Sequence, residues 1–229
     1  MDNFFILLHG TQLPENTGMV MRAMANTGIK NLRLINIQHE WPSQKAHLVS
    51  AEKSDLINVE VFSDIKSAIS DMHTVYAASA RPRNMIMQTY SPDILQNSGS
   101  DSGKIGVLFG SERNGLSNED ISFANAVIRI PSHNFSSYNL AQAVLIICYH
   151  MMQHSTENEI HLGKTDFATQ RQIDSLVDSI ESKLATNYHY WASHIRTIRN
   201  FFKRSSITHQ EINSLFGAIN KIMSDSENK

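Results

Sequence analysis

The chain has 229 residues, of which 41% are hydrophobic, enough to bury the core of one large domain or of a domain with a small appendage. Twenty lysines and arginines against 22 aspartates and glutamates give a net charge of −2, which excludes a strongly basic protein but not a local basic face for nucleic acid. The single cysteine excludes a disulfide framework and a multi-cysteine zinc or iron–sulfur site.

No targeting or membrane segment is visible in the sequence. The apolar run at residues 4–8 is short and follows Asp2 rather than a basic region, which is atypical of a signal peptide. The longest apolar run, residues 143–149, is far shorter than the roughly 20 residues that a membrane helix needs. We therefore expect a soluble cytoplasmic protein with no metal centre.

The first two-thirds of the chain alternate between strand and helix patterns. Apolar segments rich in β-branched or aromatic residues predict strands at residues 4–9, 32–36, 74–79, 104–109 and 127–130, with a weaker one at 59–62. Helical periodicity predicts helices at residues 15–26, 44–53, 64–71 and 139–154. This alternation favours an α/β fold with a mostly parallel sheet covered on both faces. The last helix is apolar nearly all round, so we expect it to be buried on more than one side, within a monomer or at a subunit interface.

The composition changes after residue 154. Residues 155–166 are polar and lack a clear period, as is typical of a linker. Three helical patterns follow, at residues 169–185, 190–203 and 209–223. Thr208 and Glu211 have the spacing of a capping box at the start of the last one. The predicted organisation is an α/β domain at 1–156, a linker at 157–168 and an all-helical extension at 169–229.

Several familiar motifs are absent. No G-x-G-x-x-G pattern supports dinucleotide binding, and the segment GSERNG has Walker glycine spacing but is followed by Leu116 instead of lysine. His150 and His154 have zincin spacing without the general-base glutamate, so they are better explained as packed or hydrogen-bonded helix histidines. Cys148 lies among apolar residues, where a structural thiol is the simpler interpretation.

Four segments are unlike ordinary packing: PENTGMVMRAMANTG, ASARPRN, LFGSERNGL and IPSHNFSSYNL. In the first, Arg22 lies among methionines and alanines, either as a snorkelling or ion-paired residue or as a functional one. The other three each follow a predicted strand, and the carboxyl ends of parallel strands are where α/β sheets bind ligands. Glu112 and Arg113 in the third segment can pair with each other or with a substrate. The clustering of three polar turns predicts a ligand site.

The first, third and fourth segments, in this order and at this spacing, closely resemble the three motifs of the SPOUT class of RNA 2′-O-ribose methyltransferases. The Ser-x-Asn of the third motif is matched by Ser137 and Asn139. The resemblance covers about the first 155 residues. The region LATNYHYWASHIRTIRNFFKRSSITHQEINSLFGAI resembles the C-terminal extension of the branch that methylates nucleotide 32 of tRNA, in the anticodon loop.

The resemblance implies a fold, a cofactor and an assembly. Members of this class form a homodimer of α/β domains whose C-terminal part is a deep trefoil knot. They bind S-adenosylmethionine in the knot through three loops at strand ends. Matched by motif, the cofactor-binding residues are Ala78, Ser79, Ala80, Gly110, Ile130, Ser136, Ser137 and Tyr138. Tyr138 departs from the leucine that is usual at this position, which changes the shape expected for the pocket.

The resemblance also implies catalytic residues. Arg22 matches the central arginine of the first motif, with Asn16 as its partner in position, and Ser137 and Asn139 would orient cofactor and ribose. Arg22 is either a proton acceptor or a phosphate clamp, and a guanidinium whose pKa exceeds about 12 favours the clamp. The family arginine of the second loop, expected to contact RNA, corresponds to Arg81 or Arg83.

The extension carries a basic segment. Residues 182–210 contain five lysines and arginines and no acidic residue. Arg196, Arg199 and Lys203 share one helical stripe, which predicts a surface for RNA phosphates, whereas the aromatic residues nearby are expected in the core. The partner is therefore expected to be RNA, most simply tRNA. The alternatives are an rRNA 2′-O-methyltransferase of the same fold and a non-catalytic RNA-binding homologue.

Overall fold

A computed structural model describes residues 2–80, 87–97, 103–133, 137–154, 166–184, 191–205 and 207–227 of the chain. Its strands form one seven-stranded sheet in the order β3-β2-β1-β6-β4-β7-β5. Every neighbouring pair is parallel. The predicted α/β class with a mostly parallel sheet is therefore confirmed.

All predicted strands are present, with ends that differ from the prediction by at most two residues. The strands are β1 (Phe4–His9), β2 (Asn31–Ile35), β3 (Asn58–Phe62), β4 (Thr74–Ala78), β5 (Thr89–Tyr90), β6 (Ile105–Phe109) and β7 (Ala126–Ile128). Only β5 was not predicted. It has two residues, too few to show a period of two, and it forms only because it pairs with β7 at the sheet edge.

The helices of this domain also follow the predicted order. They are α1 (Pro14–Thr27), α2 (Gln44–Val49), α3 (Ile65–Ala68), α4 (Asn118–Ser122) and α5 (Leu140–His154), with 3₁₀ helices η1 (Ser54–Leu56) and η2 (Pro92–Asn97). Helix α2 ends earlier than predicted because Ala51 and Glu52 adopt positive φ angles of 53° and 61°. The unpredicted α4 is short and begins with a capping box between Ser117 and Asp120.

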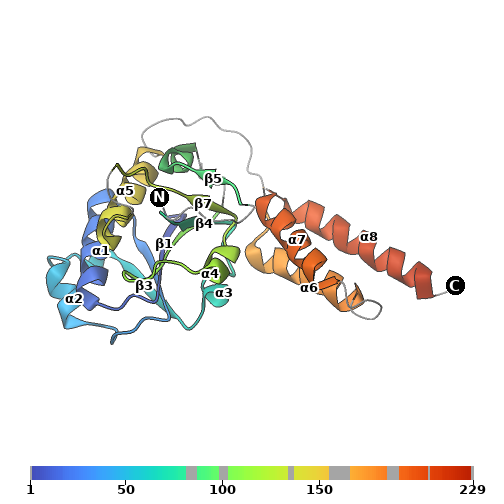
Figure 1. The fold of residues 1–229 in the computed structure, drawn as a ribbon, viewed down its shortest axis with the longest axis horizontal. Coiled ribbons are helices and arrows are strands. Elements are labelled where there is room, and N and C mark those ends of the chain that lie inside the picture. The colour runs from blue at the N-terminus through green and yellow to red at the C-terminus, as the bar shows by residue number, and fades with distance from the viewer. Residues whose placement is uncertain are drawn as a thin grey trace.

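Helices cover both faces of the sheet, as predicted (Figure 1). Phe4, Ile6 and Leu8 of β1 belong to a core shared with α1, α5 and η2. Phe5 and Leu7, which point the other way, pack with α3 and α4. Both sets are almost fully buried, which explains why the sequence of β1 is apolar without interruption.

One charged residue lies inside this packing. Arg33 of β2 is only 4% exposed, and its guanidinium donates to Asp71 at 2.5 and 3.0 Å and to Glu60 at 2.8 Å. Lys104 also donates to Asp71, at 2.6 Å. Burial alone would raise the pKa of the Asp71 carboxyl, but hydrogen bonds and charges from Arg33 and Lys104 hold it well below its usual range. The paired charges therefore offset the desolvation of Arg33.

The three predicted C-terminal helices are present as α6 (Gln170–Leu184), α7 (Trp191–Arg204) and α8 (His209–Glu227) (Figure 1). They enclose a separate apolar core that includes Leu176, Val177 and Ile212. The predicted capping box is confirmed, because Glu211 accepts from the backbone of Thr208 at 2.7 Å and the Thr208 hydroxyl accepts in return. Of the predicted linker, residues 157–165 lie outside the described part, and 166–168 already run alongside the start of α8.

The extension is hydrogen-bonded to the α/β domain at two places, the start of α6 and the end of α7. At the start of α6, the Gln170 N–H donates to the Met72 carbonyl at 2.8 Å. At the end of α7, the Lys203 ammonium donates to the Ser122 carbonyl at 2.9 Å, and Asn125 donates to the Lys203 carbonyl. These hydrogen bonds join the extension to the domain at two places.

Helix α5 is buried on one side only. Val144, Ile147 and Cys148 are fully buried, whereas Leu145 and Tyr149 are 44% and 50% exposed. Burial raises the pKa of the Cys148 thiol to about 12, as expected of a structural thiol. Within the described residues, no helix is both long and apolar enough to cross a membrane.

Candidate functional site

A pocket of about 270 Å³ lies at the carboxyl ends of β4, β6 and β7. The structure gathers there all the predicted cofactor residues that it describes: Ala78, Ser79, Ala80, Gly110, Ile130, Ser137 and Tyr138. The eighth, Ser136, lies outside the described residues. The three strand-end segments therefore converge, as the polar turns after the strands predicted.

The glycine-rich segment after β6 forms a tight turn at one wall of the pocket. The Gly115 N–H donates to the Ser111 carbonyl at 2.8 Å, and Gly115 itself has a φ of 65°. A Cβ on Gly110 would lie 2.1 Å from the Gly115 carbonyl carbon. Only glycine allows the two backbones to come this close, and their peptide groups then line the pocket.

The segment before α5 also lines the pocket, through Ser137, Tyr138 and Asn139. The Asn139 side-chain oxygen accepts from the Ala141 N–H at 2.9 Å and so caps the helix. The Tyr138 hydroxyl donates to the Pro131 carbonyl at 2.9 Å, which joins the two ends of this loop. The tyrosine that departs from the family pattern therefore contributes a hydrogen bond that leucine could not make.

Glu112 links this pocket to the first motif. One carboxylate oxygen accepts from the Asn16 side-chain amide at 2.7 Å, and the other accepts from the Gln12 N–H at 3.1 Å. The sequence suggested only Arg113 or a substrate as the partner of Glu112, and the structure assigns it to Asn16 instead. The missing signal was tertiary, because the two residues are 96 positions apart.

Arg22 stands apart from the pocket. It is exposed on α1, does not line the pocket, and has no hydrogen bond within the described part of the chain. Asn16 is six positions earlier, about 240° around the helix, so the two side chains point in different directions. A single chain thus brings Asn16, through Glu112, to the pocket but leaves Arg22 facing solvent.

The structure divides the predicted basic stripe of α7. Arg196 is exposed. Arg199 donates to Asp174 at 2.6 Å and to Asp178 at 2.9 Å, so its charge is already paired. Arg81 and Arg83, the other predicted RNA contacts, lie outside the described residues.

Lys203 does not fit the prediction of a phosphate contact. It is 4% exposed, lies over the Phe123 ring at 5.4 Å, and donates to a backbone carbonyl. Burial lowers the pKa of its ammonium to about 8. The prediction failed because the acidic partners of α7 come from α6 and its burial comes from the α/β domain, neither of which local sequence reveals.

The aromatic residues of α7 are also divided. Phe202 is 9% exposed and lies in the core, as predicted, whereas its neighbour Phe201 is 57% exposed. No metal site is found among the described residues, since no three histidine, cysteine, aspartate or glutamate side chains are grouped for one.

A parallel α/β sheet with a pocket formed by three strand-end turns defines an α/β protein with a ligand site at the carboxyl edge of the sheet. Comparison with known proteins identifies the family. Residues 3–149 match the SpoU rRNA Methylase family, and the chain belongs to it. The predicted SPOUT class is thereby confirmed.

Individual relatives extend the similarity to the helical extension. The tRNA (cytidine/uridine-2′-O-)-methyltransferase TrmJ of Sodalis glossinidius (strain morsitans) is 28% identical, covering 97% of this chain and 92% of that protein. An uncharacterized tRNA/rRNA methyltransferase of Haemophilus influenzae is 25% identical, covering 97% and 95%. The crystal structure of TrmJ from Z. mobilis ZM4 superposes with a TM-score of 0.82 at 29% identity, covering 95% of this chain and 97% of that one.

Proposed function

We propose that this protein transfers a methyl group from S-adenosylmethionine to the ribose 2′-hydroxyl of a cytidine or uridine at nucleotide 32 of tRNA. The observation that carries the proposal is the convergence of the three strand-end segments on one pocket. Family membership supports methyl transfer, and the naming of similar full-length relatives as tRNA cytidine/uridine 2′-O-methyltransferases supports the substrate.

The pocket residues fit S-adenosylmethionine. The peptide groups of the Gly110–Gly115 turn offer donors and acceptors for polar groups, and Ile130, Leu140 and Ala143 offer an apolar surface for the adenine. Helix α5 begins at the same pocket. When bound, the cofactor supplies an electrophilic methyl group.

The residues of this chain would contribute mainly positioning, because methyl transfer to a hydroxyl is an in-line displacement. Ser137 and Asn139 line the pocket from one segment, where they can orient cofactor and ribose. Glu112 holds Asn16 at the rim. We assign Arg22, as a protonated guanidinium, to the substrate phosphate and to the oxyanion that develops on the ribose.

Arg22 does not line the pocket of its own chain, so it can reach a reacting ribose only if another pocket faces α1. We propose that a second copy of the chain supplies that pocket. Exposed apolar side chains on and beside α1 and α5 support a homodimer: Leu13, Met19, Leu145 and Tyr149. We also propose the trefoil knot, which is supported by the insertion of β6 between β1 and β4, and of β7 between β4 and β5. A cytosolic tRNA-processing role agrees with these assignments.

The decisive experiment maps ribose methylation across total tRNA and rRNA from cells with and without the protein. Loss at tRNA nucleotide 32 supports the proposal, whereas loss at an rRNA position assigns the rRNA alternative. No methyl transfer from labelled cofactor to any RNA would leave only a non-catalytic RNA-binding protein.

Arg22→Ala tests the catalytic assignment in the same assay. We expect methylation to be abolished while cofactor affinity stays within a few-fold, because Arg22 lies outside the cofactor pocket. Lys45→Ala, a similarly exposed cation on neighbouring α2, is the control. Arg22→Ala activity within tenfold of the wild type, from a folded protein, would contradict the assignment.

A further inference from the structure

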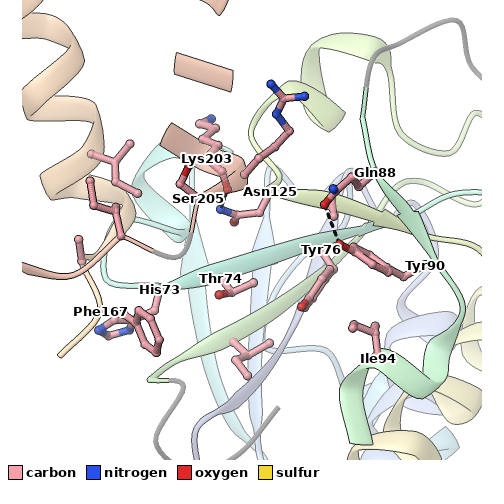
Figure 2. Close-up of a pocket in the computed structure, with 16 residues that line it drawn as sticks. His73, Thr74, Tyr76, Gln88, Tyr90, Ile94, Asn125, Phe167, Lys203 and Ser205 are labelled. Atoms are coloured by element: carbon pink, nitrogen blue, oxygen red, sulfur yellow. Dashed lines mark hydrogen bonds between the residues drawn. The ribbon is translucent and has the colours of Figure 1, made fainter. Parts of the chain in front are cut away.

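A second cavity, of about 290 Å³, lies between the α/β domain and the helical extension. Thr74, Ile105 and Ala126, at the amino ends of β4, β6 and β7, contribute to its wall. It is therefore at the opposite edge of the sheet from the cofactor pocket. Figure 2 shows side chains of β4 and β5 on one side of it and those from Phe167 and the end of α7 around the rest.

Aromatic rings are a prominent part of this interdomain cavity. Tyr76, Tyr90, His73 and Phe167 all line it, and Tyr90 is only partly buried (Figure 2). Flat π faces of this kind can stack on a nucleobase of any identity.

Two neutral polar groups of the wall have unused hydrogen-bonding capacity. The Tyr90 hydroxyl donates to the Gln88 side-chain oxygen at 2.6 Å, which leaves the Gln88 amide nitrogen without a partner in the described part of the chain. The Thr74 hydroxyl likewise has no partner there. A donor amide and a hydroxyl beside aromatic faces match the polar edge of a nucleobase.

The charge of the wall is positive. Among the described residues that line the cavity there is no carboxylate, but there are two cations, Lys203 and Arg204. The Arg204 Nε donates to the Asn200 carbonyl at 3.2 Å, and its two terminal amino groups have no acidic partner there. This contrasts with Arg199, which two aspartates neutralise. The nearest acidic influences come from behind the wall, where the charge of Asp166 acts on His73 and that of Asp174 on Lys203, so Arg204 is the cation available to an anion.

We propose that the interdomain cavity binds a single unpaired nucleotide, with the base against Tyr90 and the phosphate at Arg204. Its volume is close to the lower end of the roughly 300–1,000 Å³ typical of small-molecule sites, so it admits one nucleotide and excludes a duplex. If the nucleotide belongs to an RNA strand, the proposal rests on the proposed function. A free nucleotide offers the same base and phosphate and would be bound by the same residues.

Such a site assigns a role to the extension. Arg204 is the last residue of α7 and Tyr90 lies on β5, so one bound nucleotide would contact both the extension and the α/β domain. The RNA contact of the extension then lies at this junction and at exposed Arg196, instead of along the predicted stripe that contains the paired Arg199.

The test uses the full chain with its cofactor pocket saturated by S-adenosylhomocysteine, titrated calorimetrically with cytidine 5′-monophosphate and with cytidine. Tyr90→Leu should weaken both ligands at least about fivefold, and Tyr90→Phe, which keeps the ring, should retain both. Arg204→Gln should weaken the monophosphate and leave cytidine unchanged. Arg171→Gln removes an exposed cation of the same extension outside the cavity and should change neither.

A tRNA transcript distinguishes the source of the nucleotide. If the site accepts a nucleotide of RNA, Arg204→Gln should flatten the slope of log affinity against log salt by about 0.7, and Arg171→Gln should not. A monophosphate effect without a tRNA effect assigns the site to free nucleotides.

The failure of this proposal differs from failure of the proposed function. Wild-type protein that methylates tRNA, with all four variants binding both small ligands and tRNA as the wild type does, overturns the cavity site alone. A protein that transfers no methyl group to RNA, yet binds the monophosphate through Tyr90 and Arg204, refutes the proposed function and keeps the site.

Discussion

Replacing Lys203 by methionine should stabilise the protein at neutral pH. Lys203 is 4% exposed, and its ammonium donates to the Ser122 carbonyl and lies over the face of the Phe123 ring. Burial is the largest influence on its pKa and lowers it from 10.5 to about 8, although the charge of Asp174 acts in the opposite direction. The folded state therefore holds a poorly compensated cation that methionine, of similar length, would replace with an apolar side chain.

The magnitude follows from the difference between the folded and unfolded pKa values. Below about pH 8 the lysine is protonated in both states, and the folded state carries the full penalty, on the order of 3 kcal/mol. Between about pH 8 and 10.5 the folded state has released its proton and the unfolded state has not, so stability rises with pH. Loss of the hydrogen bond to Ser122 subtracts about 1 kcal/mol. At pH 7 we expect Lys203→Met to gain about 2 kcal/mol.

Urea unfolding followed by far-ultraviolet circular dichroism at pH 7, 8, 9 and 10 would measure both effects. Other groups titrate in this range, so the informative quantity is the difference between variant and wild type at each pH. That difference should shrink as the pH rises and change sign near pH 10, where the remaining charge penalty about equals the loss of the hydrogen bond. Lys45→Met, which removes a lysine that is 73% exposed, should show no such trend.

One result would refute this reasoning about Lys203. If Lys203→Met is less stable than the wild type at pH 7 and the difference is independent of pH, then the ammonium is a net stabiliser of the docked extension. In that case, Asp174 and the Ser122 carbonyl compensate the buried charge fully.

Three further predictions concern the pocket and the buried ion pairs. Glu112→Gln places an amide group against two donors, the Asn16 amide and the Gln12 N–H, and should lower stability by about 1 kcal/mol. Methylation should also fall, because Asn16 is no longer held. Thermal melting would measure the stability and a turnover assay the methylation. Gly110→Ala puts a methyl group into the backbone of the facing turn, so calorimetry should show lost cofactor binding, and retained affinity would count against the pocket. The pKa of Asp71 is lowered in the folded state, so the stability that this residue contributes is present above about pH 4 and is lost as the pH falls further. Asp71→Asn should be less stable at pH 7 in the same unfolding assay, because Arg33 loses its ion pair. The variant should also be less sensitive to acid, because this carboxyl no longer titrates.

Local patterns in the sequence determined most of the α/β domain. Strand β1 is a continuous apolar run because both of its faces are buried. Helix α1 begins at Pro14 and is capped at its end by Gly28, whose φ is 74°. The capping box at Thr208 likewise lies within four consecutive residues. Such signals are readable because the interacting residues are close in the chain.

The sequence alone also indicated which segments would line the strand-end pocket. Each polar turn directly follows a strand, and parallel strands place their carboxyl ends at one edge. The three segments then meet because β6, β4 and β7 are neighbours in the sheet, an order that the structure supplies. What could not be read was the link between Glu112 and Asn16, which depends on the position of α1 against β6.

The tertiary structure alone decided the roles of the cations in the extension. The sequence showed three basic residues at helical spacing without an acid nearby, but charge pairing acts through space. Arg199 is neutralised by α6 and Lys203 is buried against the α/β domain, which leaves Arg196 and Arg204 exposed. The interdomain cavity has the same origin, because its walls come from segments as distant as Tyr76 and Ile207, and only packing brings them together.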